Sequence, residues 1–229
     1  MRTRTTSMVL GILLCQLLAA QEQTIEELYL QGDIKTMMMK AEAESSDRNF
    51  KMSALEKIEK MIADGSASDN TQIVDILSNL ASESVSSIAR EQGYILNDYP
   101  EVRREAVRLL GLIGSNRTTY ELGRVLLNDP EPMVTSEAIL AITSIDDNED
   151  RVLRDQLIYR AMRRQTVLTR DNRLASIFIS SVEAIVQRDL DKINPLLLAE
   201  VVRIAEAGSG YNHAVRKQAS GLLRDFQNL

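Results

Sequence analysis

The stretch EVRREAVRLLGLIG, residues 101–114, has the pattern of an amphipathic helix. Its apolar residues recur at helical spacing and form one stripe, made of Val102, Ala106, Leu109, Leu110 and Ile113. Nearly the same stripe returns near the end of the chain in AVRKQASGLLRDF, as Val215, Ala219, Leu222, Leu223 and Phe226. A helix pattern that recurs in this way predicts a fold built from repeated units.

Two further copies of the stripe lie between these stretches. Glu105-Ala106 aligns with Glu137-Ala138 at an offset of 32 residues, and a proline precedes each stripe. The copies begin at Val102, Val134, Leu174 and Val215, with spacings of 32, 40 and 41 residues. A fainter copy spans residues 50–61. We call these the inner helices.

Other apolar patterns of similar length alternate with the inner helices, and we call them the outer helices. They cover residues 25–41, 73–89, 121–127, 152–162 and 193–205. The first carries a stripe of Ile25, Leu28, Ile34 and Met38. No stretch alternates at period two for long enough to predict a strand. The sequence therefore predicts an all-α protein, an α-solenoid of about five antiparallel helix pairs whose apolar faces are buried only by stacking.

The helix pair with proline at the turn, followed by Val-Arg and Glu-Ala, resembles the HEAT repeat family, and most closely the short HEAT-like units of phycobilin lyases. The resemblance is clearer over residues 95–229 than over the atypical repeats of residues 24–92. It implies a HEAT-like superhelix whose inner helices line a concave binding surface. In the family, the Arg after Val joins a ladder between repeats. Arg103 and Arg216 match that position, whereas Thr135 and Ala175 do not.

The N-terminal segment has the form of a signal peptide. Arg2 and Arg4 precede an apolar run from Met8 to Ala20, which is too short to span a bilayer comfortably. We expect residues 1–20 to be a signal peptide and residues 21–229 to form the HEAT-like domain. Loss of the two arginines takes the formal net charge from −6 to −8. The mature chain also loses Cys15, its one cysteine, and is left with no stable membrane span.

Basic side chains beside the apolar stripe of the inner helices are the candidate binding residues. They are Arg103, Arg104, Arg108, Arg173, Arg216 and Lys217. Their charge predicts a protein partner with an acidic surface. A second basic set, in the segment from Arg151 to Arg173, is either a docking patch or a solvated helix face, and the sequence leaves both open.

The sequence predicts no catalytic, cofactor or metal site, and hence no enzyme. His213 is the one histidine, and without a second His or Cys in the mature chain it lacks partners for a metal site. The acidic segment DDNED, residues 146–150, lacks the glycine and the final glutamate of a calcium loop. No phosphate-binding loop, HExxH or GxSxG motif occurs.

We therefore expect an exported, non-catalytic scaffold or adaptor that binds a protein through its concave surface. In a bacterium with two membranes, the compartment would be the periplasm. Two alternatives stay open. One is a lyase or chaperone that handles a small cofactor, by analogy with the phycobilin lyases. The other, a nucleic-acid-binding or repair protein, is disfavoured because an acidic chain repels the phosphate backbone.

Overall fold

The computed structural model describes residues 25–67, 70–85, 90–91, 94–95, 97–145, 151–188 and 193–227. The predicted signal peptide, residues 1–20, and the acidic segment 146–150 lie outside these ranges. Ten helices form in the described residues: α2 Ile25–Glu44, α3 Arg48–Ala63, α4 Thr71–Ala81, α5 Pro100–Ile113, α6 Asn116–Asn128, α7 Pro132–Ser144, α8 Arg151–Leu168, α9 Asn172–Arg188, α10 Pro195–Ala205 and α11 His213–Gln227.

The chain divides into two compact units, residues 1–38 and 39–229, with the boundary inside α2. In the first unit, the Thr36 hydroxyl donates to the carbonyl of Gly32 at 3.0 Å. Ile34 is 55% exposed and Met38 is 59% exposed, whereas Thr36 is buried. The predicted stripe is therefore wrong at Ile34 and Met38, because a different face of the helix is buried.

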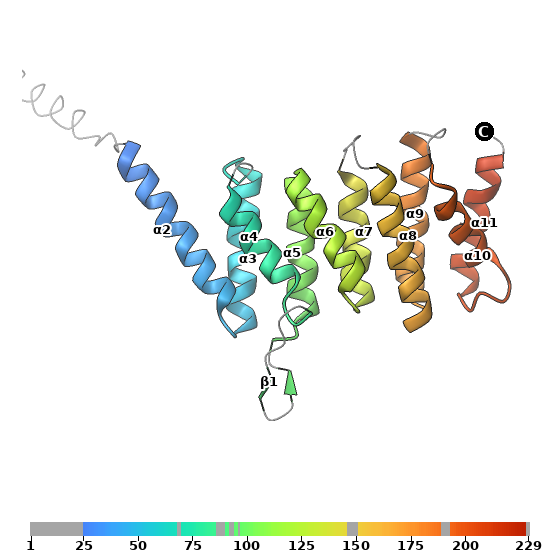
Figure 1. Ribbon diagram of the computed structural model, residues 1–229, viewed down its shortest axis with the longest axis horizontal. Coiled ribbons are helices and arrows are strands. Elements are labelled where there is room, and N and C mark those ends of the chain that lie inside the picture. The colour runs from blue at the N-terminus through green and yellow to red at the C-terminus, as the bar shows by residue number, and fades with distance from the viewer. Residues whose placement is uncertain are drawn as a thin grey trace, which may run out of the picture. The chain divides into compact units, whose positions relative to one another are not determined.

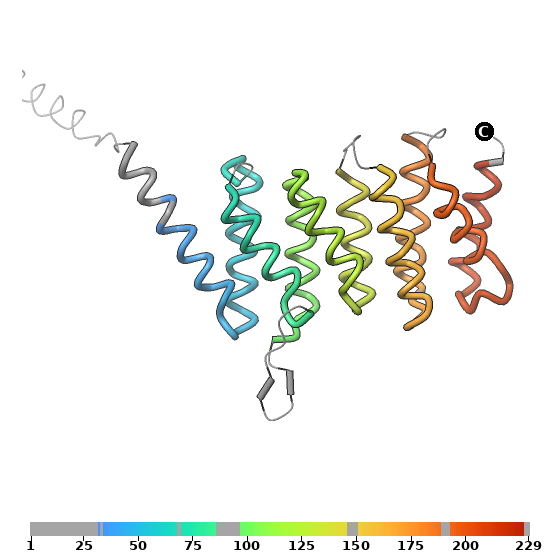
Figure 2. The backbone as a smooth tube through the Cα atoms, in the orientation of Figure 1, coloured from blue at the N-terminus to red at the C-terminus, as the bar shows by residue number. Residues whose placement is uncertain are grey.

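Two layers of helices make up the second unit (Figures 1 and 2). Helices α3, α5, α7, α9 and α11 pack side by side in one layer, and α4, α6, α8 and α10 pack in the other. Helices α4, α6 and α10 each also contact the helix that follows in the chain, and α8 contacts α7, the helix that precedes it. This arrangement confirms the predicted α-solenoid and its division into inner and outer helices.

Proline and short polar side chains set where the helices begin. Pro100, Pro132 and Pro195 each stand in the first turn of a helix, where the missing N–H costs no hydrogen bond. The Asn70 side chain accepts hydrogen bonds from the first backbone N–H groups of α4. Gly114 ends α5 with a φ of 62°, a left-handed conformation that glycine adopts without strain.

Helix α4 is shorter than the sequence predicts. The expected helix over residues 73–89 ends at Ala81, where the backbone N–H of Ser82 caps the helix and Ser84 takes a positive φ of 65°. Two antiparallel strands of two residues each follow, β1 Arg90–Glu91 and β2 Tyr94–Ile95. A strand of two residues is too short to show an alternating pattern, and the all-α class predicted from the sequence stands.

The repeated apolar stripe forms the seam between the layers. The four residues that begin the copies, Val102, Val134, Leu174 and Val215, are all buried. Helices α5 and α7 approach each other closely at Gly111, where an added Cβ would lie 2.6 Å from the Cβ of Ala141. A side chain larger than glycine at this point would force the two helices apart.

A cluster of buried polar groups holds the turn between α6 and α7. The Arg103 guanidinium on α5 donates to Asp129 in this turn, with 2.7 Å between Nε and Oδ2. The amide of Gln165 on α8 donates to the Thr135 hydroxyl at 3.1 Å and to the Pro130 carbonyl at 3.1 Å. Thr135 stands at the repeat position of Arg103, and a glutamine from the other layer contacts the turn there.

Candidate functional site

Arg103, the first of the predicted binding residues, is buried. Its side chain is 2% exposed and lies between Asp98 and Asp129. Burial by itself lowers the pKa of Arg103, but the hydrogen bonds to these carboxylates raise the pKa overall. The expectation that Arg103 lines a binding surface is therefore wrong. Arg103 is also the residue that the resemblance to HEAT repeats places in a ladder between repeats, and here it joins α5 to the turn before α7.

Arg108 lies on the surface of the inner layer, but it is already paired. Its Nη2 atom donates to Glu105 one turn earlier at 2.6 Å and to Glu59 of α3 at 2.5 Å. The hydrogen bonds to Glu105 and Glu59 raise the pKa of Arg108, while burial opposes the change. A partner would have to displace these carboxylates to use Arg108.

Arg104 on α5 and Arg173 on α9 lie on either side of Glu137 on α7. Neither arginine forms a hydrogen bond or an ion pair with another residue of the described ranges. Burial raises the pKa of the half-buried Glu137, and the attraction of Arg104, Arg108 and Arg173 opposes that rise. Two guanidinium groups without direct carboxylate partners therefore stand on two inner helices, with a shared carboxylate between them.

The last two predicted residues are neighbours on α11 and differ in their surroundings. Arg216 is half-buried and donates through Nη1 to the carbonyl of Ala207 at 3.1 Å. Lys217 is exposed on the helix next to α9 and is likewise unpaired within the described ranges. Of the six predicted residues, the structure thus leaves three cations without a hydrogen-bond or ion-pair partner in the described ranges. We call Arg104, Arg173 and Lys217 the inner-layer cations.

Gln218 was not among the sequence candidates, although it fixes part of this surface. Its Nε2 atom donates to the Ser180 hydroxyl at 3.0 Å, and its Oε1 atom accepts from the Ser176 hydroxyl at 2.7 Å. These contacts hold α11 against α9 beside Arg173 and Lys217. The signal was present in the sequence, because Gln218 occupies the repeat position of Glu105 and Glu137.

The second basic set, around α8, serves in part to join helices. Arg154 pairs with Asp155 at 2.9 Å, Arg163 lies 3.8 Å from Glu200 of α10, and Arg164 donates to backbone carbonyls at the end of α6. Arg160 stays exposed. These contacts favour the interpretation of a paired helix face over that of a continuous docking patch.

The described residues hold no group of three or more His, Cys, Asp or Glu side chains placed to bind a metal ion. Among the helices described here, none combines the length and the apolar character needed to cross a bilayer.

Comparison with known proteins gives one family. The family model for HEAT repeats matches residues 89–157, which contain α5, α6, α7 and the first turns of α8. A search among curated proteins finds none that matches. Residues 89–157 therefore match HEAT repeats, and the same two-layer packing continues beyond them as far as α11.

Proposed function

We propose that the protein is a non-catalytic scaffold or adaptor that binds a partner protein through the inner layer of its solenoid. HEAT repeats commonly mediate protein interactions, and this chain presents one helix of every repeat along a continuous layer. The observation that carries the proposal is the set of inner-layer cations, Arg104, Arg173 and Lys217. They lie on three helices of one layer, and no other described residue pairs with them.

An acidic surface on the partner is the chemistry that fits these cations. Exposed charges of one sign steer a partner of the opposite sign and set its orientation, and salt weakens this attraction. Glu137 sets a further condition, because a carboxylate already lies between Arg104 and Arg173. We propose that the partner's acidic groups contact the outward sides of these arginines and leave Glu137 in place.

Proximity labelling in the native host, followed by identification of the labelled proteins, tests this proposal. Single substitutions Arg104→Ala, Arg173→Ala and Lys217→Ala should each reduce labelling of the same neighbours and leave the melting temperature unchanged. Arg160→Ala is the matched control, because Arg160 is an exposed arginine on the outer helix α8. An unchanged set of neighbours in all three variants, or an equal loss with Arg160→Ala, would contradict the proposal.

We further propose that the protein is exported and, in a host with two membranes, resides in the periplasm. The basic start, the short apolar run and the small residues at Ala19 and Ala20 support this localisation. Cell fractionation together with N-terminal sequencing of the mature protein tests it. A mature chain that begins near Gln21 supports export, and a cytoplasmic chain that still carries residues 1–20 contradicts it.

A further inference from the structure

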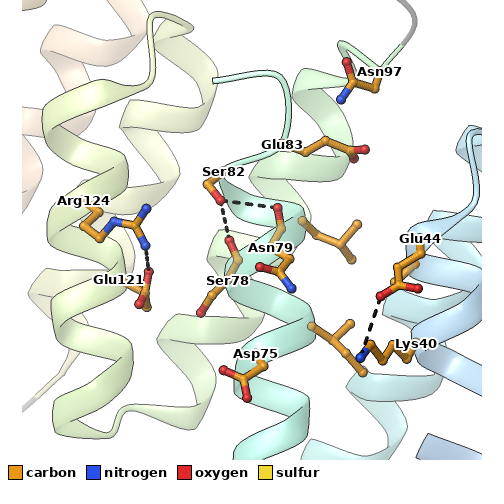
Figure 3. Close-up of a pocket in the computed structure, with 13 residues that line it drawn as sticks. Lys40, Glu44, Asp75, Ser78, Asn79, Ser82, Glu83, Asn97, Glu121 and Arg124 are labelled. Carbon is orange, nitrogen blue, oxygen red and sulfur yellow. Dashed lines mark hydrogen bonds and ion pairs between the residues drawn. The ribbon is translucent and has the colours of Figure 1, made fainter. Parts of the chain in front are cut away.

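A groove of about 560 Å³ lies in the second unit, at the opposite layer from the inner-layer cations (Figure 3). Helix α4 forms its floor, the C-terminal end of α2 forms one wall, and α6 forms the other. Charged and amide side chains line it, among them Lys40, Glu44, Asp75, Asn79, Glu121 and Arg124.

Short side chains keep the floor of the groove low. The Ser78 hydroxyl donates to the carbonyl of Val74 at 2.7 Å, and the Ser82 hydroxyl donates to the carbonyl of Ser78 at 2.8 Å. Both hydroxyls are thus engaged by their own helix and do not extend into the groove. Asn79 is exposed between them, where its amide can donate and accept hydrogen bonds. The floor therefore admits the main chain of a bound segment close to α4.

The cation in each wall of the groove is paired with a carboxylate of the same wall. Lys40 lies 3.9 Å from Glu44 on α2, and Arg124 lies 2.9 Å from Glu121 on α6. The pairs are partly exposed, and such pairs contribute little free energy, so a ligand can rearrange them at low cost. An anionic ligand finds no unpaired cation in either wall.

The floor and the end of the groove add two carboxylates whose counter-ions come from outside it. Asp75 pairs with Arg117, which does not line the groove. Glu83 accepts a hydrogen bond from Lys51 at 2.8 Å, and Lys51 is 2% exposed and also donates to the carbonyl of Ala43. Lys51, which does not itself line the groove, thus holds the Glu83 carboxylate in position. Carboxylates therefore outnumber cations on the surface that a ligand meets.

We propose that this groove binds a segment of a partner protein that carries lysine or arginine side chains. The excess of carboxylates selects a cation, the low floor admits a peptide main chain, and Asn79 supplies hydrogen bonds to that chain. A sugar lacks the aromatic platform it usually stacks on, since the lining holds no aromatic side chain among the described residues. The site differs from the inner-layer surface in its helices and in the sign of its charge, so either proposal can fail without the other.

Titration of the full chain with two terminally blocked peptides tests the proposal. One has the sequence Gly-Ser-Arg-Ser-Lys-Gly, and the other has glutamate in place of arginine and lysine. Amide chemical-shift mapping by NMR should show the basic peptide at α4, α6 and the end of α2, and the acidic peptide should leave these residues unperturbed. No binding of the basic peptide, or shifts spread over the whole acidic surface, would overturn the proposal.

Substitutions then separate the groove from general attraction to an acidic protein. Glu44→Gln and Asp75→Asn should each raise the Kd by about three- to fivefold, which is the range for a partly exposed charge pair. Glu183→Gln makes the same change of charge at an exposed position on α9 and should leave the Kd unchanged. Asn79→Arg should abolish binding, because it fills the floor with a tethered cation. Equal effects of Glu183→Gln and Asp75→Asn, or full binding by Asn79→Arg, would refute the groove as the site.

Discussion

Replacement of Gly111 by alanine tests the packing of α5 against α7 most directly. The new Cβ would lie 2.6 Å from the Cβ of Ala141 and 3.0 Å from its Cα. Carbon atoms in contact normally stay about 3.5–4.0 Å apart, so the two helices must separate by roughly 1 Å. Ala141 has no flexible chain end that could move aside, so the backbone must shift.

Two opposing effects set the size of the change. Overpacking of this kind costs about 1–3 kcal/mol. Alanine is favoured over glycine inside a helix by about 1 kcal/mol, which offsets part of that cost. We expect Gly111→Ala to lower the free energy of unfolding by up to about 2 kcal/mol, which corresponds to a fall in melting temperature of up to about 8 °C for a chain of this size. Urea unfolding followed by circular dichroism measures the effect.

Gly221 on α11 supplies the matched control, because no atom lies within 4 Å of the Cβ that alanine would add there. Gly221→Ala should therefore stabilise the protein by about 0.5–1 kcal/mol through helix propensity alone. In the double variant Gly111→Ala/Ala141→Gly, the closest atom is removed and much of the loss should be recovered. If Gly111→Ala stabilises the protein as much as Gly221→Ala does, then α5 and α7 do not touch as described.

Three further substitutions address buried charge. Arg103→Met leaves Asp129 buried without its cation and should cost about 3–5 kcal/mol in urea unfolding, whereas Arg104→Met at the surface should cost less than about 1 kcal/mol; similar losses would contradict the buried pair. Lys51→Met removes the donor to Glu83 and should also destabilise by more than about 1 kcal/mol, measured in the same way; an unchanged midpoint would count against that contact. Burial raises the pKa of Glu200, which is 1% exposed, so the native state binds this proton more tightly than the unfolded chain does. The stability that this carboxyl contributes is complete below its ordinary pKa of 4.5 and is lost as the pH rises through the higher native pKa. Glu200→Gln should therefore lose less stability than the wild type as the pH rises above about 4.5; parallel pH profiles of the two proteins would be the contrary result.

The sequence predicted the architecture well because the repeat itself carries the information. The residues that begin the stripe, Val102, Val134, Leu174 and Val215, are buried at each copy, and the helix order follows from the alternation of the stripe with the outer helices. The prediction was weaker at helix ends, since Ser82 and Ser84 stop α4 through local backbone geometry that apolar spacing does not reveal.

The candidate site was predicted only in part. Spacing along α5 places Arg103, Arg104 and Arg108 near the stripe, but it does not say which guanidinium is buried or already paired. That depends on Asp129 and Glu59, which reach α5 from other parts of the chain. The groove beside α4 was missed for a similar reason, because its walls come from α2 and α6 and no local motif joins them.

The clamped turn between α6 and α7 has a mechanical consequence. Arg103 reaches it from α5, and Gln165 reaches it from α8, so four consecutive helices depend on one short segment. Under tension applied at the two ends of the chain, these four helices should unfold together in a single step and not one helix pair at a time. A force-extension trace recorded with optical tweezers should then show one large increase in extension for the unfolding of these four helices.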